Sequence, residues 1–586
     1  MSSDVGLSNL INDLFGGVVL QICSGKLFQN DIEYRNNLRG VIYTNLKLFG
    51  DEKIETQAGV MLPTSSLGAS TAIVYELEEL VESTGNPDQR GILISSGVDS
   101  YISDFSAILS FALNCTASTN YELTNRLISD QKGLSTLSKP KDVVKQVFNK
   151  EIFCQPHDIE HLTSFTNQLI GLERKVFLGV MRAIRTYVTA MHRIADDLEL
   201  AYTLLVASLE SITQDFDNHK ITWQDFDEKK RKTIDLALAE ASESTSNKVK
   251  DALTKGEYAS IARRFNSFSI NHVKPSFYRD EAIGVINPIS KLDLPKALSN
   301  AYKARSGYVH SLQKLPTLLV HSVPHSDTCR IKNSTWLTIQ GLSRLTRHII
   351  TNFVYSQGTV EREKYNYHLE RTGIIQAPLA PQYWLNNMSF YEGSGNKKLE
   401  GFLNQLAECT LSRGNAQLTD IREMLTAVEG QYHDFKNKDK RPYAALYTLF
   451  NGVLSDDEKM KGSNRFTQRV ENTFLKPSPE ALILNLLFCN TPDWTVEQHY
   501  ECLHQYLKTR DNKNCFRMPS VYESGMVLDL AERYRLAGNI DVSLDLITLA
   551  VENHPDHENL RHFEAAYNKE TQTISWREIM FPKKEE

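Results

Sequence analysis

The spacing of apolar residues along the first quarter of the chain alternates between strand and helix patterns. Residues 38–49 are rich in β-branched and aromatic residues, and Gly50–Glu52 then forms a turn signal. Residues 53–62 are therefore expected to return as the second strand of a hairpin. Short strands are also expected at residues 71–75 and 91–95, a helix over residues 101–113, and a linker near residues 135–142. Together they predict an α/β domain over residues 1–150.

The apolar period becomes that of long helices from residue 158 onward. Asp158 is a candidate helix N-cap, and no Pro or Gly interrupts residues 181–216. The pattern predicts two long helices, or one helix bent near Ala195–Asp197. Because residues 201–210 are almost apolar on every side, they should lie at the centre of a bundle.

Further helix signals follow up to residue 355. Polar helices are expected over residues 229–242 and 254–272. Asp293–Pro295 is a helix start, with Asp as N-cap and Pro in the first turn, and this helix should reach Gln313. Ser334 should cap a last helix. We therefore expect an antiparallel helical bundle with a long insertion over residues 151–355.

The remaining residues, 356–586, also show helical periods. Helices are expected at residues 396–412, 418–435, 443–454, 480–489, 496–507, 522–537 and 541–553. The last two, joined by Gly538 and Asn539, resemble one tetratricopeptide unit, with matching residues at Ala531, Tyr534, Gly538, Ala550 and Pro555. The hairpin at 522–555 could bind a protein or peptide partner, or it could only pack on the helices before it. The predicted fold class is thus mainly α, with an N-terminal α/β domain.

Composition limits the class of protein. The 586 residues are 41% hydrophobic and 23% charged, which is typical of a folded chain with large cores. No apolar run is long enough to span a membrane, and the N-terminus lacks the basic region of a secretory signal. The eight Cys residues are scattered singly without a C-x-x-C pair. We expect a cytoplasmic protein without membrane contact.

Charge is unevenly distributed along the chain. Residues 261–350 hold 13 Lys and Arg and four Asp and Glu, a local charge of +9, although the whole chain carries −7. Residues 1–90 hold six basic and twelve acidic residues. The basic segment is either a solvated face that pairs with acidic parts of the same chain or a surface for an anionic partner.

The residues with the clearest chemistry lie on the helix that starts at Asp293. Arg305, Ser306 and His310 resemble the signature of the HEPN superfamily, which is Arg, then a polar residue, then His on a bundle helix. Residues 204–212, with Glu210, resemble the family's helix that ends in a Leu-Glu pattern. The resemblance is closest to the ApeA-like HEPN branch and covers about residues 160–355.

The resemblance implies a metal-independent endoribonuclease, often a toxin or antiphage effector, whose site forms where two such helices meet in a homodimer. In RNA the 2′-OH is the nucleophile, so a His with a pKa of about 6.5 can exchange the protons and an Arg can stabilise the phosphate. His310 is then the general acid/base and Arg305 the phosphate stabiliser, with no cofactor or metal. Some toxin members carry a modifiable Tyr two residues after the His, whereas Leu312 stands here.

Neighbouring residues are candidates for supporting roles. Glu210 could orient Arg305 or His310, or it could be an ordinary salt-bridge carboxylate. Ser306, Tyr308 and Lys303 could contact RNA, or they could be ordinary surface residues.

Two weaker motifs are interpreted as structural. Cys154, His157 and His161 have the spacing of zinc ligands, but a fourth ligand is missing nearby, and an N-capped helix start is the favoured interpretation. Gly393–Lys398 is Gly-rich and basic but lacks the P-loop frame, so we predict a loop there rather than a phosphate site.

The leading hypothesis is therefore an RNA-cleaving enzyme whose terminal regions sense a trigger or restrain the nuclease. The alternative is a non-catalytic HEPN scaffold that oligomerises or binds nucleotide or protein partners. A generic helical adaptor remains if the motif arose by chance.

Overall fold

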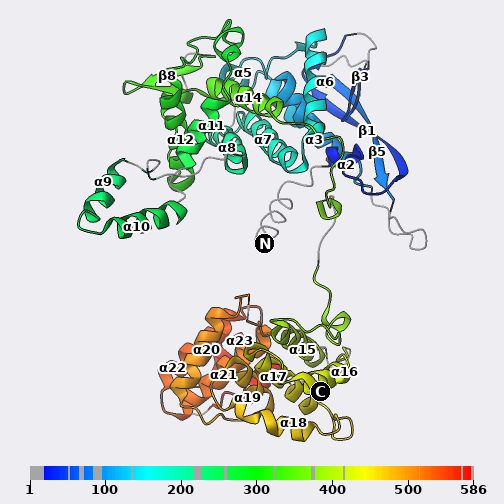
Figure 1. Ribbon diagram of the computed structural model, residues 1–586, viewed down its shortest axis with the longest axis vertical. Helices are drawn as coiled ribbons and strands as arrows, with labels where there is room; N and C mark the ends of the chain where they lie inside the picture. Colours follow the sequence, from blue (N-terminus) through cyan, green and yellow to red (C-terminus); the bar gives the residue numbers. More distant parts are fainter. Residues whose placement is uncertain are drawn as a thin grey trace. The chain divides into compact units, whose positions relative to one another are not determined.

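The computed structural model describes residues 19–49, 53–64, 71–83, 95–132, 138–216, 223, 226, 228–256, 261–320, 324–370, 377–412, 416–513, 515–568 and 572–582. The chain forms two compact units, Met1–Gln376 and Ala377–Glu586. The structure is mainly helical with a small N-terminal sheet, as the sequence predicts at this level (Figure 1).

The sheet of the first unit is antiparallel, in the strand order β3-β4-β5-β1-β6. Its strands are β1 (Ile32–Thr44), β3 (Ile54–Thr56), β4 (Gly59–Leu62), β5 (Thr71–Glu82) and β6 (Ala117–Ser118). The long strand β1 pairs along its length with β5. The helix α3 (Val98–Leu113) packs on this sheet, where the rings of Tyr75 and Phe105 stack with centroids 4.7 Å apart.

The predicted hairpin between residues 38–49 and 53–62 is wrong. Residues 53–62 form their own small hairpin, because β3 and β4 pair with each other around Gln57 and Ala58. The hydroxyl of Tyr75 donates to the Ala58 carbonyl and fastens this turn to β5. Most of the strand expected at 91–95 lies outside the described residues, as do residues 135–137 of the expected linker. The end of that linker forms the short helix α5 (Pro140–Val143).

Three helices follow where the sequence predicts two: α6 (Pro156–Gly171), α7 (Arg174–Arg193) and α8 (Leu198–Phe216). The expected break near Ala195–Asp197 is present, but the chain also breaks at Leu172 and Glu173. The prediction of Asp158 as N-cap is wrong, because the N-cap is Gln155 and Asp158 lies three residues later. The Asp158 carboxylate accepts the Gln155 N–H at 2.9 Å and so satisfies the helix start from within the first turn.

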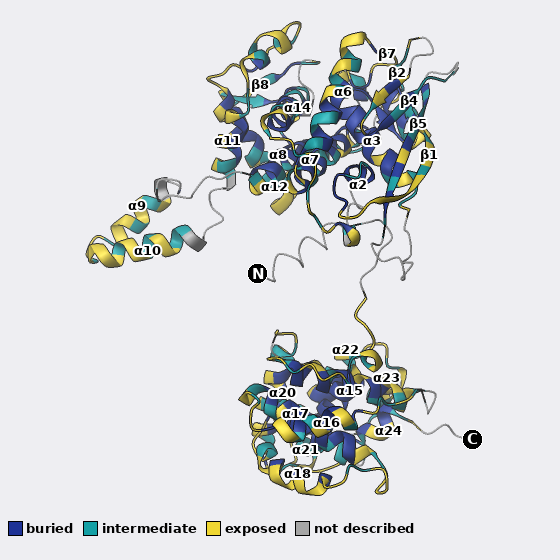
Figure 2. Cartoon of the chain, turned by 45° about the vertical axis from the view of Figure 1, so that its right-hand side comes forward, coloured by how far each residue is buried: buried dark blue, intermediate teal, exposed yellow. Residues whose placement is uncertain are grey.

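The helix α8 is central, as its apolar sequence predicts. It packs against α7, α11 (Ile261–Asn271), α12 (Leu294–Ser311) and α14 (Ile339–Ser356). Figure 2 shows α7 and α8 as largely buried, whereas α9 (Glu228–Ala237) and α10 (Glu243–Gly256) are mostly exposed. The expected helix over residues 254–272 is therefore divided between α10 and α11.

The predicted cap at Ser334 is wrong. Ser334 begins β9 (Ser334–Leu337), which pairs with β8 (Thr328–Ile331). The helix α14 starts later, where the Thr338 hydroxyl accepts the Gly341 N–H at 3.1 Å. The side-chain amide of Asn300 on α12 instead donates to Ser334 Oγ at 2.8 Å, so Ser334 joins this hairpin to α12.

One hydrophobic core runs from Val19 to Tyr367 through the sheet and the central helices. Ion pairs inside it include Arg185 with Asp104 and the fully buried Arg174 with Glu370. The regions expected at 1–150 and 151–355 therefore share a core, and the compact unit ends near residue 376 instead.

The second unit is built of α-helices around a core of its own. The helices expected there are α15 (Ser394–Leu411), α16 (Arg422–Gln431), α17 (Asn437–Val453), α19 (Pro479–Phe488), α20 (Val496–Thr509), α21 (Ser520–Leu536) and α22 (Ile540–Asn553). The sequence pattern does not predict the short helices α18 (Ser463–Val470), α23 (Glu558–Ala566) and α24 (Trp576–Met580). Within the parts of the chain that the structure describes, no helix is long and apolar enough to cross a membrane.

Candidate functional site

The helices α8 and α12 bring two of the predicted site residues together. Arg305 Nη2 lies 2.8 Å from Glu210 Oε2, in an ion pair whose carboxylate side chain is only 6% exposed. The Arg305 side chain is 22% exposed, so its guanidinium reaches from the surface to a carboxylate inside the bundle. Of the two roles that the sequence allows for Glu210, this contact fits both an orienting group and a structural salt bridge.

Tyr302 completes this cluster and was not identified from the sequence. Its hydroxyl donates to Glu210 Oε1 at 3.5 Å, and its ring centroid lies 5.9 Å from the guanidinium carbon of Arg305. Burial and the nearby Glu210 carboxylate raise the pKa of Tyr302. Tyr302 lies three residues before Arg305 on the same helix, and this spacing is the signal that could have found it.

The guanidinium of Arg305 is only partly satisfied inside the chain. Its Nε atom is buried without a hydrogen-bond partner, whereas Nη2 is bound to Glu210. A guanidinium can donate to a carboxylate and a phosphate from different edges of its planar fork. The buried Nε cannot reach a phosphate outside the chain, so a ligand would have to meet the exposed part of the side chain, which is 22% exposed.

His310 lies in the last turn of α12 and is exposed. The helix ends directly after it, because Leu312 adopts a positive φ of 48° and the Gln313 N–H donates to the Gly307 carbonyl at 3.2 Å. The His310 side chain makes no hydrogen bond or ion pair with the described residues.

Arg305 and His310 therefore form no side-chain hydrogen bond with each other within the described chain. Five residues along an ideal helix correspond to a rotation of about 140° around its axis, which points the two side chains in different directions. Val309 and Leu312 beside His310 are apolar, and they are 49% and 76% exposed. A surface of this kind is typical of a contact with another molecule.

The other predicted residues except Glu210 lie on the same helix as Arg305 and His310. Lys303 is exposed, and Ser306 and Tyr308 are half-buried. Burial, with smaller contributions from Asp197 and Glu199, raises the pKa of Tyr308. No side-chain hydrogen bond or ion pair joins Ser306 or Lys303 to Arg305 or His310 in the described part of the chain.

The basic segment at 261–350 is divided between ion-paired and exposed cations. Arg344 pairs with the fully buried Asp327, as Arg305 pairs with Glu210. Exposed lysines without an ion pair among the described residues are Lys274, Lys291, Lys296, Lys303, Lys314 and Lys332. These lysines are free to meet an anionic partner.

The spacing of Cys154, His157 and His161 does not produce a metal site. Cys154 is buried, His157 is exposed beside Asp158, and the His161 ring packs near Phe165. Across the described ranges, no group of three or more His, Cys, Asp and Glu side chains could hold a metal ion.

Backbone N–H groups of the Gly-rich segment at 393–398 are already bound by a side chain of the protein. Asp439 is buried and accepts the N–H groups of Gly393 and Gly395, each at 3.0 Å to Oδ1. The predicted loop is wrong in part, because α15 starts at Ser394. Lys398 points inward and donates to the Leu385 carbonyl at 2.9 Å. This helix start is therefore occupied by a carboxylate, and its lysine is not available to a phosphate.

Lys398 makes the stability of the chain depend on pH. Burial, followed by the neighbouring Lys397, lowers the pKa of Lys398 to about 8. Between about pH 8 and 10.5 the unfolded chain binds a proton at this lysine that the folded chain does not, so the stability rises with pH. We expect wild type to gain stability relative to Lys398→Met across this range in urea unfolding, whereas exposed Lys508→Met shows no such trend. A constant difference between wild type and Lys398→Met would contradict this prediction.

Comparisons with protein-family models, with curated proteins and with solved structures give no match. The function is therefore inferred from the residues and their geometry.

Proposed function

We propose that the chain is a metal-independent endoribonuclease of HEPN type that works as a homodimer. The observation that carries this proposal is the placement of Arg305 and His310 on α12. A nearly buried carboxylate holds Arg305, and the exposed end of the same helix carries an unpaired His310. Residues 160–355 would form the HEPN-like bundle, with the α/β region before it and the helical region, including the tetratricopeptide-like hairpin, after it.

The reaction requires two groups that this helix supplies. An imidazole takes the proton from the ribose 2′-OH or gives one to the leaving 5′-oxygen, and a guanidinium stabilises the negative charge that grows on the phosphate. A second copy related by a two-fold axis would bring a second pair of these residues opposite the first. The exposed Val309 and Leu312 would then be covered, and the exposed lysines of residues 261–350 would hold the RNA backbone.

The experiment is an RNA-cleavage assay with the full chain in EDTA, on tRNA and total RNA, with the mass of the particle measured in the same buffer. The proposal expects a dimer that cleaves RNA in EDTA. A folded monomer without cleavage on any of these RNAs contradicts it. We further propose a cytoplasmic location, a role in toxicity or antiphage defence, and a protein partner at the C-terminal helices.

A second candidate is a non-catalytic HEPN scaffold that oligomerises or binds nucleotide or protein partners. The observation that favours it is the ion pair itself, because Glu210 already neutralises the charge of Arg305. A guanidinium used only for packing would show the same contact.

Substitution of Glu210 separates the two candidates. If Glu210 positions Arg305 for phosphate, Glu210→Ala should lower the cleavage rate about tenfold, and Glu210→Asp should restore part of it, because oriented groups lose rate when misplaced. The loss of the buried hydrogen bonds should also cost about 1–3 kcal/mol of stability. A suitable control is Asp215→Asn on the same helix, where the pair with Arg182 is 2.9 Å long and partly exposed. A change in stability with an unaltered cleavage rate would favour the scaffold.

A further inference from the structure

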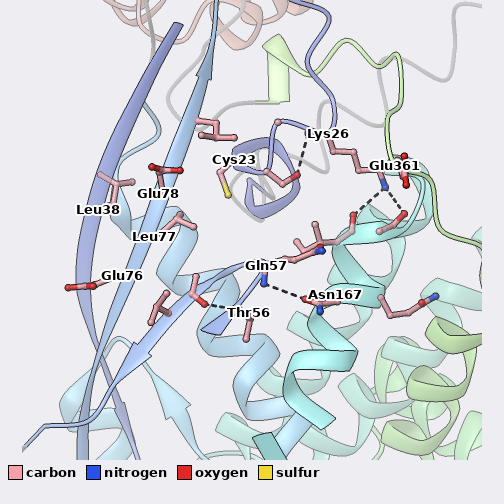
Figure 3. A pocket seen from close by; sticks show the side chains of 18 of the residues that line it. Cys23, Lys26, Leu38, Thr56, Gln57, Glu76, Leu77, Glu78, Asn167 and Glu361 are labelled. Carbon is pink, nitrogen blue, oxygen red and sulfur yellow. Dashed lines mark hydrogen bonds between the residues drawn. The ribbon is translucent and has the colours of Figure 1, made fainter. Parts of the chain in front are cut away.

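A pocket of 1420 Å³ opens in the first unit, beside the sheet (Figure 3). Its walls come from β1 and β5, the turn between β3 and β4, the helix α6, the segment Cys23–Lys26 and residues 359–362. Pockets for small molecules are usually about 300–1,000 Å³. This pocket is large enough for a short stretch of polymer.

The sheet has a gap at the pocket. The strand β4 pairs with β5 only where Val60 lies opposite Glu76, Met61 opposite Tyr75 and Leu62 opposite Val74. On its other edge β5 is paired with β1 as far as Glu82. From Leu77 onward, no strand of the described chain therefore pairs with β5 on the side of β4.

In an antiparallel strand, successive residues point their N–H and C=O groups to opposite sides. This alternation identifies the residues whose main-chain groups face the gap. Thr56 and Gly59 lie opposite each other at the two-residue turn, so their N–H and C=O groups point toward one another. The next residue, Val60, therefore points its groups toward β5 and Glu76. Every second residue of β5 points its N–H and C=O groups to this side, so after Glu76 the next two such residues are Glu78 and Leu80.

Glu78 and Leu80 both line the pocket. Their N–H and C=O groups make no hydrogen bond to the described chain on this side. Such unpaired strand edges are templates for another extended segment, which gains main-chain hydrogen bonds and places alternate side chains into adjoining spaces. Leu38 and Leu77 supply apolar surface for such side chains.

The charges of the lining do not suit a polyanion. The Lys26 ammonium is directed at the end of α6, where it donates to the carbonyls of Ile170 and Gly171 at 3.2 Å and 2.5 Å (Figure 3). Arg39 pairs with Glu76 across the sheet. Arg362 is exposed and is the one lining cation held neither by an ion pair nor by carbonyl groups of the described chain. Nucleic-acid phosphates would therefore find few free cations here.

Neutral hydrogen-bonding groups remain on the opposite wall. Asn167 on α6 accepts the Gln57 N–H at 3.4 Å through Oδ1 (Figure 3). The amide nitrogen of Asn167 has no partner among the described residues and can donate to a carbonyl. Ser164, one turn earlier on the helix, is exposed and also lines the pocket.

We propose that this pocket binds an extended, uncharged peptide segment of another protein, which pairs with Glu78 and Leu80 of β5 as a strand in line with β4. Leu77–Glu82 offers an edge for about five residues of peptide at about 3.3 Å per residue. This site is separate from the ribonuclease residues, and its test does not depend on RNA cleavage.

The test uses a random heptapeptide phage library panned on the full-length protein. Enriched sequences are synthesised with a fluorescent label, and their affinities are measured by anisotropy for wild type, Ser164→Trp and Glu160→Trp. Ser164→Trp fills the pocket from an exposed position, whereas Glu160 is exposed on the same helix outside the pocket. We expect Ser164→Trp to weaken binding about tenfold or more, a change of about 1.4 kcal/mol, and Glu160→Trp to leave it unchanged.

A second measurement keeps the proposal testable if Ser164→Trp does not fold. N-methylation at each position of the best peptide should weaken binding at every second residue, because only alternate N–H groups face β5. The proposal is overturned if no sequence is enriched, if Ser164→Trp binds the peptides as wild type does, or if the effect of N-methylation does not alternate. A labelled single-stranded RNA that competes with the peptide and loses affinity in Ser164→Trp would also overturn it.

Discussion

His310→Ala is expected to lower the rate of RNA cleavage in EDTA by about 100-fold or more. A positioned general acid or base usually contributes about 10²–10⁴ to a rate, and the proposed site contains one imidazole per chain. Because His310 is exposed and forms no hydrogen bond or ion pair with the described chain, its removal should change the stability by no more than about 0.5 kcal/mol. Initial rates on a labelled tRNA, with melting temperatures of both proteins, measure these two effects.

Arg305→Ala should lower the rate to a similar extent, and Arg305→Lys should restore little of it. A lysine keeps the charge but lacks the planar fork that binds Glu210 and a phosphate together. Lys303→Ala on the same helix is the matched control, since Lys303 is exposed and has no ion pair in the described chain. This control should weaken RNA binding slightly and more so at low salt. Equal rates for wild type, His310→Ala and Arg305→Ala would remove both residues from the mechanism.

Arg344→Ala should cost about 3–5 kcal/mol of stability, the largest effect on folding that we expect for one residue of the basic segment. Its Nε donates to Asp327 Oδ2 at 3.1 Å, and the Asp327 side chain is fully buried. The guanidinium also lies 3.8 Å from the centroid of the Phe277 ring. Removing one partner of a buried ion pair leaves the other charge unpaired in the interior, at about this cost.

Urea unfolding of wild type and Arg344→Ala measures this effect. Arg182→Ala provides the control, because the Arg182–Asp215 pair is about one-third exposed on both sides and such pairs contribute about 0–1 kcal/mol. A loss below about 1 kcal/mol in Arg344→Ala would show that the buried pair does not hold α14 to the β8–β9 hairpin.

The sequence predicts helices well where local signals are strong. Asp293 and Pro295 mark the start of α12 correctly, although Asp293 makes no side-chain cap bond. A serine is a cap only if a helix follows it, and Ser334 is followed by a strand. Short helices such as α18 hold too few apolar positions to show a period.

Pairing between distant segments leaves no local signal. Along its length β1 pairs with β5, which follows two other strands of the sheet in the sequence, and the nearest turn signal suggested a different hairpin. The shared core of the α/β region and the central helices is another long-range property. It includes buried charges such as Arg174, whose partner Glu370 is 196 residues away.

The candidate site is predictable in its residue types but not in its geometry. The motif indicates Arg305, His310 and Glu210, and the structure adds that Arg305 contacts Glu210 from 95 residues away whereas His310 stands alone at the surface. The pocket beside β5 is not predictable from the sequence, because its walls come from six segments that are separate along the chain.

The chemistry of the cleaved ends tests the central claim most directly. The wild-type protein is incubated with a defined tRNA in EDTA, and the new ends are identified by mass spectrometry. Attack by the 2′-OH predicts 2′,3′-cyclic phosphate and 5′-hydroxyl ends. Cleavage that requires a divalent metal ion and leaves 5′-phosphate ends would contradict a mechanism based on His310 and Arg305.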